Sequence, residues 1–431
     1  MLPRAALLTL LALPVLAQPP LDELGRDHKL RILVDKVMQP EADWVTEEWM
    51  VAETAEMGFN VFSPRLGHDD LDAVEQVTRW CEDNGLYHMP WMRGSLTAPG
   101  GPEADGRRMV WDSGEESPLW SPCSDEFWEW TTRYVVAYAE MSALRPGLIG
   151  VFLDYENYAA GGPGMLYELS YDAGILARFA EDQGVDIPDL PPRERRGWLE
   201  AEGLHDSFQA FQHDHWRQRC IELRRRVDAH NPAFMFCIYP APGSPFMIEG
   251  CYEWATDAAP LILADAVTYG RPGRFAPQDE SLETNRTRLI ERREVAEAAG
   301  IHYLYAGGID PVVQGADPEF CGKNAVAISD VTDGYWVFYE GPTYDGTHPE
   351  YRRWFTWANR AIQAGEPAAW REPRETPVDL ALDWIDRMGW QGLAPLDPEA
   401  AGGDLPPVSL RGRHLLLVSA RAGEPLGVTL A

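Results

Sequence analysis

The chain has 431 residues, of which 45% are hydrophobic and 24% are charged, a composition that predicts a folded globular protein with a large core. Its 68 acidic and 37 basic residues give a formal charge of −31. This excess of negative charge argues against nucleic acid, anionic membranes and polyanionic substrates as partners, and favours neutral ligands. The sequence gives no indication of the oligomeric state.

The first residues carry the pattern of a secretory signal peptide. Arg4 supplies a positive charge, residues 5–16 form a short apolar stretch, and the small residues Val15 and Ala17 precede the expected cleavage site. The apolar stretch is shorter than the roughly 20 residues of a membrane anchor. We therefore expect residues 1–17 to be removed and the mature protein to be secreted or periplasmic, without a membrane-spanning segment.

Eight short apolar runs, rich in β-branched and aromatic residues, alternate with helical patterns along the chain. Such an alternation indicates parallel strands covered on both faces, and eight units are the number in a (β/α)8 barrel. A doubly wound open sheet is the alternative, but no glycine-rich phosphate loop follows the first strand. We predict an α/β TIM barrel over residues 25–366. The expected strands are 30–38, 59–65, 86–93, 148–158, 233–240, 260–270, 301–310 and 334–342.

Helical patterns lie between these runs, and several end at Gly or Asn just before the next strand, as helix C-caps do. These C-cap residues are Gly58, Gly85, Asn231 and Gly300. The expected helices are 45–58, 71–85, 124–142, 206–231, 284–300 and 348–365.

Three further stretches depart from this repeat. Residues 94–122 and 159–207 form long βα loops, the second with at least one extra helix, on the side of a barrel that carries active sites. After residue 366 the pattern changes to proline-rich pieces between short strand-like runs. We expect residues 367–431 to form a small β-rich appendage.

The fourth expected strand ends in VFLDYENY, which carries Asp154 and Glu156. Residues two apart in a strand point to the same side, so both carboxylates are expected to face the barrel mouth. Two neighbouring carboxylates raise the pKa of one of them. A protonated acid beside an ionised carboxylate is what glycosidic cleavage requires. The alternative is that one acid caps the following loop or pairs with an arginine.

Other strand ends bring polar and aromatic groups to the same mouth. Glu340, after the eighth strand, is the second candidate catalytic carboxylate, and its alternative role is an ion pair with Arg65 or Arg93. Asp265 and Asp310 are weaker candidates that could instead cap loops. Tryptophans such as Trp111 and Trp120 lie in loops near the mouth and suit stacking on sugar rings. The expected substrate-binding residues are Asp35, Arg65, Trp91, Arg93, Tyr239, Asp265, Tyr269, Tyr305 and Trp336.

The sequence predicts no metal or cofactor. It contains no HExxH motif, no P-loop and no GxSxG nucleophile elbow, and its histidines lack ligand spacing. The six cysteines show no CxxC pair and no zinc spacing. In an exported protein some of them could form disulfides, and buried free thiols are equally plausible.

At LDYENY the chain resembles the glycoside hydrolases built on (β/α)8 barrels. In the chitinase-like family the fourth strand ends in DxxDxDxE, so this resemblance implies Glu156 as the acid and Asp154 as the carboxylate that assists the substrate's N-acetyl group. The two earlier Asp positions of that motif hold Ile149 and Phe152 here. The chain is also similar to the retaining glycosidases, which place an acid Glu after strand four and a nucleophile Glu after strand seven. Glu156 fits the acid, whereas Glu340 follows the eighth expected strand.

These patterns together predict a secreted glycoside hydrolase acting on a neutral or amino-sugar poly- or oligosaccharide. Glu156 would protonate the leaving oxygen, and Asp154 or Glu340 would act at the anomeric carbon. The alternative is a carbohydrate-binding barrel without catalysis, in which the carboxylates only bind sugar hydroxyls. A lyase or deacetylase ranks last, because the sequence shows no metal motif.

Overall fold

The computed structural model describes residues 20–35, 45–65, 69–158, 164–166, 169–242, 249–269, 278–311, 318–339, 344–372, 408–410 and 413–415. The chain divides into two compact units, Met1–Glu372 and Pro373–Ala431. The expected signal peptide and Glu340 lie outside the described residues.

The first unit is built on a nine-stranded sheet whose neighbouring strands all pair in parallel. Its strand order is β3-β2-β1-β13-β12-β11-β10-β7-β4. The strands are β1 (Leu30–Asp35), β2 (Val61–Pro64), β3 (Tyr87–His88), β4 (Trp91–Arg93), β7 (Gly150–Asp154), β10 (Met235–Tyr239), β11 (Leu261–Asp265), β12 (Tyr303–Ile309) and β13 (Gly334–Tyr339).

The sheet closes into a ring because β3 and β4 are two halves of one strand position. β3 pairs with β2 and β4 pairs with β7, so this position connects the two ends of the strand order. Between the halves, the Met89 amide donates to Phe62 on one side, and the Pro90 carbonyl accepts from Phe152 on the other. The nine strands therefore occupy eight positions. The predicted TIM barrel is confirmed, and an open sheet is wrong.

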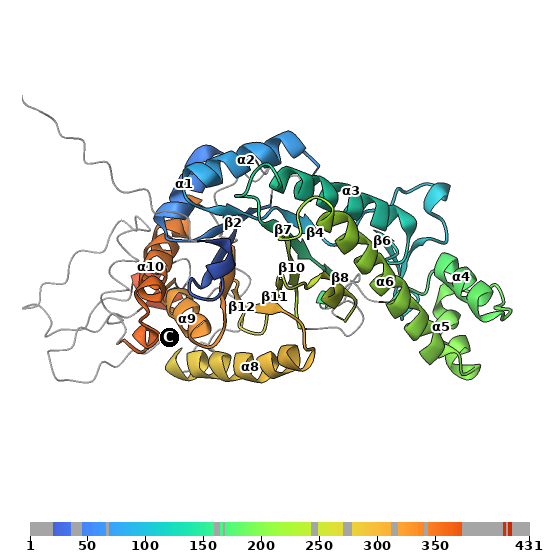
Figure 1. The fold of residues 1–431 in the computed structure, drawn as a ribbon. Helices are drawn as coiled ribbons and strands as arrows, with labels where there is room; N and C mark the ends of the chain where they lie inside the picture. Colours follow the sequence, from blue (N-terminus) through green and yellow to red (C-terminus); the bar gives the residue numbers. More distant parts are fainter. Residues whose placement is uncertain are drawn as a thin grey trace, which may run out of the picture. The chain divides into compact units, whose positions relative to one another are not determined.

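Helices surround this ring (Figure 1). Side chains of Asp70 and Ser124 cap the first turns of α2 and α3. Gly58, Gly85 and Gly300 adopt positive φ after their helices, as expected of C-caps. The helices are α1 (Glu48–Glu56), α2 (Leu71–Asp83), α3 (Asp125–Ser142), α6 (His205–Asp228), α8 (Gln278–Ala298), α9 (Pro318–Val331) and α10 (Tyr344–Ala364), with the short 3-10 helices η1 (Leu21–Glu23), η2 (Pro102–Ala104), η3 (Tyr252–Trp254) and η4 (Ala369–Arg371).

The strands divide the core into two layers, because alternate residues point to opposite faces. One buried cluster, which includes Phe152, Tyr239 and Trp336, fills the inside of the ring. The other, which includes Leu153 and Tyr305, packs between the ring and its helices. This alternation identifies which residues at the strand ends face the barrel mouth.

The long loops after the third and fourth strand positions fold into a separate packing layer. One short antiparallel pair (Arg108–Val110 with Glu116–Trp120) and two helices lie beside the first half of α6 (Figure 1), whereas a second pair (Glu156–Tyr158 with Gly164–Leu166) directly follows β7. Phe208 of α6 belongs to this layer, whereas Trp216 and Leu223 of the same helix belong to the barrel core. The elements are β5 (Arg108–Val110), β6 (Glu116–Trp120), β8 (Glu156–Tyr158), β9 (Gly164–Leu166), α4 (Ala173–Gln183) and α5 (Pro192–Ala201).

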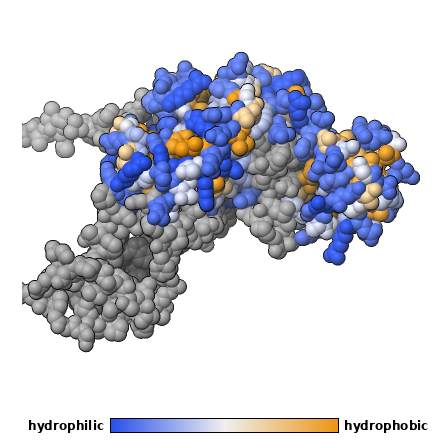
Figure 2. Space-filling model, turned by 90° about the horizontal axis from the view of Figure 1, so that it is seen from below, coloured by the Kyte–Doolittle hydropathy of each residue, from blue (hydrophilic) through white to orange (hydrophobic). Residues whose placement is uncertain are grey.

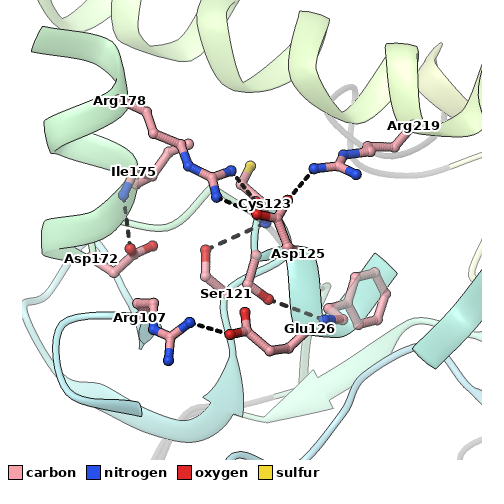
Figure 3. A network of polar contacts seen from close by, with 11 residues as sticks. Arg107, Ser121, Cys123, Asp125, Glu126, Asp172, Ile175, Arg178 and Arg219 are labelled. Atoms are coloured by element: carbon pink, nitrogen blue, oxygen red, sulfur yellow. Dashed lines mark hydrogen bonds and ion pairs between the residues drawn. The ribbon is translucent and has the colours of Figure 1, made fainter. Parts of the chain in front are cut away.

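Ion pairs connect this layer to the barrel helices (Figure 3). The carboxylate of Asp125, at the start of α3, pairs with Arg178 of α4 and with Arg219 of α6. Arg107 pairs with Glu126 of α3. Several helices therefore share one polar network, which fixes the inserted layer against the barrel.

The second unit is described at β14 (Val408–Leu410) and β15 (Arg413–Leu415), which pair antiparallel. In the first unit, hydrophilic residues cover most of the face shown in Figure 2, in line with the charged composition. All six cysteines are buried and free. Within the described ranges, no helix has the length and apolarity needed to cross a bilayer.

Candidate active site

Asp154 and Glu156 lie where the chain leaves the barrel, and the strand is interrupted between them. Asp154 is the last residue of β7, while Glu156 begins the β8–β9 hairpin. The intervening Tyr155 belongs to the outer core, with its ring 5.7 Å from that of Trp216. The expectation of one continuous strand through Glu156 is therefore wrong. The two acids remain neighbours because the Asp154 Oδ1 atom accepts the Glu156 backbone N–H at 2.9 Å.

Asp154 points into the ring, on the same side of β7 as Phe152, and is completely buried. Its Oδ2 atom lies 2.7 Å from Nη1 of Arg93, the neighbouring residue in register on β4. Burial raises the pKa of Asp154 to about 6, although Arg93 and the Glu156 N–H oppose that shift. Asp154 therefore fits the alternative role expected for one of the two acids, because it accepts a backbone N–H just after the strand and pairs with an arginine.

Glu156 is half-buried, in contrast to Asp154. Its charge acts on two buried groups, because it raises the pKa of Asp154 and also that of the Tyr269 hydroxyl. Glu156 therefore lies within electrostatic reach of both Asp154 and Tyr269. A partly exposed carboxylate beside a fully buried one is an asymmetric pair, which suits different roles in one reaction.

Arg65 follows β2 and lies between two aromatic rings of the mouth. Its guanidinium is 4.6 Å from the ring centre of Trp91 and 4.5 Å from that of Phe338. Its positive charge also reaches Asp154, where it lowers the pKa. Arg65, Trp91 and Arg93 therefore lie on one side of the buried carboxylate, and their expected role in binding substrate stays a prediction.

Three aromatic residues expected to bind substrate form one cluster. The ring centres of Tyr239 and Trp336 are 4.8 Å apart, and those of Tyr269 and Trp336 are 5.6 Å apart. The ring of Phe152 packs under Trp336 at 5.4 Å. Burial is the main cause that raises the pKa of Tyr269, and Tyr239, Asp310 and Glu156 act in the same direction. Tyr239 and Trp336 are buried at 2% and 0% exposure, so of these three expected substrate-binding residues only Tyr269 is half-buried.

Asp265 and Tyr305 depart from the expectation. Leu261 and Leu263 of β11 belong to the outer core, so Asp265, in the same row, points away from the mouth. Its Oδ2 atom accepts the Tyr305 hydroxyl and pairs with Arg292 of α8. These two residues connect the ring to a helix, and the expectation that they face a substrate is corrected.

Asp310, by contrast, directly follows the seventh strand position on its inward row. Leu304 and Ala306 of β12 belong to the inner cluster, and Asp310 continues their alternation. It is 7% exposed, and its charge acts on Tyr269, as that of Glu156 does. The sequence makes Asp310 a weaker candidate that could cap a loop, and its place directly after the seventh strand is the signal that identifies it as a mouth residue.

The remaining expected site residues divide into three cases. Asp35 ends β1, but its side chain is not among those described. Glu340 lies outside the described residues. Trp111 and Trp120, expected to stack on sugars, are buried in the core at 2% and 6% exposure. Among the residues that the structure describes, no group of three His, Cys, Asp or Glu side chains could hold a metal ion.

No protein-family model matches the sequence. No curated protein matches it either.

The fold resembles three solved beta-galactosidases, from the psychrophilic Marinomonas ef1 (TM-score 0.52, 11% identity), from Rahnella sp. R3 (0.51, 13%) and from Bacillus circulans sp. alkalophilus (0.51, 12%). The matches cover 83%, 79% and 78% of this chain, but 62%, 57% and 56% of theirs. The chain thus spans less than two thirds of the length of these proteins. At these identities the likeness is one of fold, and it supports the architecture built above from strand pairing.

Proposed function

We propose that this protein is a glycoside hydrolase that cleaves a glycosidic bond in a neutral or amino-sugar poly- or oligosaccharide. The observation that carries the proposal is the asymmetric carboxylate pair after the fourth strand, where half-buried Glu156 lies beside buried Asp154. At the same mouth the half-buried Tyr269 packs against the buried rings of Tyr239 and Trp336. Rigid aromatic faces suit the CH surfaces of sugar rings.

In the proposed reaction Glu156 donates a proton to the leaving oxygen. Asp154 acts through Glu156, because its Oδ1 accepts the Glu156 N–H and Arg93 holds its Oδ2. We therefore assign Asp154 a positioning role. The arrangement offers no support for the chitinase-like role, in which Asp154 would assist a substrate acetamido group.

The anomeric carbon needs a second carboxylate, as nucleophile or as base for water. Asp310 fits this role, since it directly follows the seventh strand on the row of residues that points inward. Its charge acts on Tyr269, as that of Glu156 does, although the two acids follow different strands. Glu340, after the eighth strand, is the other candidate from the sequence. A carboxyl separation of about 5–5.5 Å corresponds to retention of configuration, and one of roughly 6.5–9.5 Å to inversion.

The test is a panel of neutral and amino-sugar polysaccharides and oligosaccharides, assayed for release of reducing ends. Wild type should release them from at least one member, and Glu156→Gln should lose at least about 1,000-fold in rate while still binding that glycan. In a retaining reaction, azide should rescue Glu156→Ala on an aryl glycoside with an activated leaving group, because that group departs without an acid and azide attacks the glycosyl-enzyme without a general base. Asp310→Asn and Glu340→Gln, run in parallel, identify the second carboxylate as the one whose loss is comparable.

One observation favours a second candidate, a carbohydrate-binding barrel without catalysis. Asp154 is fully engaged by Arg93 and by the Glu156 amide, as in a purely structural ion pair. Under this alternative, wild type and Glu156→Gln bind the same glycan and neither releases reducing ends.

We also propose that the protein is exported. The support is the amino-terminal sequence, in which Arg4 precedes a short apolar stretch and small residues. Mass spectrometry of the protein recovered from its native host, with a new amino terminus at Gln18, is the measurement that tests this.

A further inference from the structure

We propose a second sugar-binding site in the layer inserted after the third and fourth strands. The site holds one neutral sugar unit of the polymer that the protein is proposed to cleave, and this inference rests on that proposed function. The site is a cavity of about 170 Å³ between the β5–β6 turn, α5 and the first turns of α6. The residues that define it are Trp111, Asp112, Tyr171, Arg196, His205 and Gln209.

The size of the cavity limits its ligand. Drug-sized ligands occupy sites of roughly 300–1,000 Å³, and a water molecule takes about 30 Å³. A volume of about 170 Å³ is therefore larger than an ordered water needs and smaller than an extended ligand needs. It matches a single ring, with the rest of a polymer outside.

The buried wall of the cavity is aromatic and rigid. Trp111 and Tyr171 are only 2% and 3% exposed. The Tyr171 hydroxyl lies 2.8 Å from Nε2 of His205, and the two rings stack with their planes 15° apart. This bond fixes both rings before a ligand arrives, so ligand binding does not have to order them.

Gln209 supplies the cavity with a side-chain amide. It lies four residues after His205 on α6, and therefore on the same face of the helix. Among the described residues, its side-chain amide makes no hydrogen bond, although it lines the cavity. An amide offers both donors and an acceptor, which is the complement of a sugar hydroxyl.

The charges of the cavity favour a neutral ligand. Arg196 lies 2.7 Å from the carboxylate of Asp112 and 2.9 Å from that of Glu200. Two carboxylates therefore already balance its guanidinium, and a uronate or phosphate would meet like charge. Hydroxyl groups can share hydrogen bonds with such a pair without disrupting it.

The cavity lies on the same side of the barrel as Glu156. α6 runs back from the carboxyl ends of the strands to the start of β10, and its 24 residues span about 36 Å, whereas the five residues of β7 span about 17 Å. The first turns of α6, with His205 and Gln209, therefore extend beyond the ring on the mouth side. One long substrate can then occupy both places.

The test compares Gln209→Leu with Gln218→Leu, which changes the same residue type at an exposed position farther along α6. Both are made in the full-length Glu156→Gln protein. The probes are galactose, glucose, mannose, xylose, N-acetylglucosamine and sodium glucuronate, followed by saturation-transfer NMR. We expect Gln209→Leu to reduce the transfer to at least one neutral sugar at least threefold, while Gln218→Leu leaves it unchanged. Any sugar bound at the barrel mouth contributes equally to both variants.

Equal signals in the two variants for every neutral sugar overturn the proposal, as does a loss confined to glucuronate. Because this readout needs no turnover, it separates the second site from the proposed activity. If binding depends on Gln209 and no glycan is cleaved, the second site is supported and only the hydrolase proposal is overturned. In active protein, Gln209→Leu should raise the KM for the cleaved polymer at least fivefold, and an unchanged KM overturns the link between the two sites.

Discussion

Arg93 and Asp154 pair side by side across two neighbouring strands, with 2.7 Å between Nη1 and Oδ2, on the inside of the ring. The arginine side chain is 31% exposed and the carboxylate is completely buried. Burial outweighs the ion pair, so the pKa of Asp154 rises to about 6. The free energy of unfolding should therefore depend on pH in an unusual direction for an ion-paired aspartate.

The first prediction concerns this pH dependence. The unfolded pKa of an aspartate is about 3.9, so between about pH 4 and pH 6 the native state binds more protons at Asp154 than the unfolded state does. The contribution of Asp154 to stability is therefore fully present below about pH 4 and falls as pH rises through 6, by about 3 kcal/mol. Urea unfolding at pH 4, 5, 6 and 7 should show a decline in wild type that Asp154→Asn lacks. Identical pH profiles in the two proteins would contradict the assignment.

The second prediction removes the arginine. Arg93→Met leaves the buried Asp154 carboxylate without its ion pair, and breaking a buried pair costs about 3–5 kcal/mol. We expect a loss at the lower end of that range at pH 7, because Arg93 is partly exposed, and a smaller loss at pH 4, where Asp154 is protonated. The measurement is denaturant unfolding at both pH values. Adding Asp154→Asn to Arg93→Met should recover most of the loss, and a double variant no more stable than Arg93→Met would argue against the pair.

The third prediction concerns the packing below Trp336. A Cβ atom at Gly308 would lie 2.6 Å from the Asp265 carbonyl oxygen and 2.7 Å from the Trp336 ring. Gly308→Ala should therefore cost about 1–3 kcal/mol and displace Trp336. Gly197→Ala is the matched control, because Gly197 lies within α5 with no atom within 4 Å of the added Cβ, and it should stabilise by about 0.5–1 kcal/mol. Thermal unfolding followed by circular dichroism, with tryptophan fluorescence for Trp336, distinguishes them. Equal effects of the two substitutions would disprove this packing.

The fourth prediction concerns the thiols. All six cysteines are buried and free, and burial raises the pKa of Cys81 and Cys237. Because thiolates are the reactive form, a thiol reagent should leave the native protein unmodified over minutes and titrate six thiols per chain after denaturation. A count of four would show one disulfide, for which Cys220 and Cys251 are the neighbouring pair, since their thiols are hydrogen-bonded.

The barrel could be predicted from sequence because each strand is a compact apolar run between helical patterns. All eight expected strand positions are present, and Asp154 is the last residue of the fourth. The interruption at Tyr155 could not be predicted. It depends on a tertiary contact, the packing of Tyr155 against Trp216 of α6, and no local pattern in LDYENY encodes it.

The sequence also could not predict to which face of the sheet the polar side chains at the strand ends point. Strands buried on both faces are apolar throughout, so the sequence does not show which row points inward. Asp265 and Tyr305 consequently looked like mouth residues although they face α8. Trp111 and Trp120 lie among glycines and prolines, which suggested exposed loops, yet both are buried in the large cluster that also packs the helices on the ring.

The ring has a structural seam. Its third position consists of two short pieces, Tyr87–His88 and Trp91–Arg93, with Pro90 between them, which has no amide hydrogen to donate. Because this position is built from two short pieces and lacks one amide donor, we expect its amide protons to exchange before those of the longer strands when the native protein fluctuates open. Because Trp91 and Arg93 belong to this position, its local opening would break the ion pair between Arg93 and Asp154 before the other strands separate.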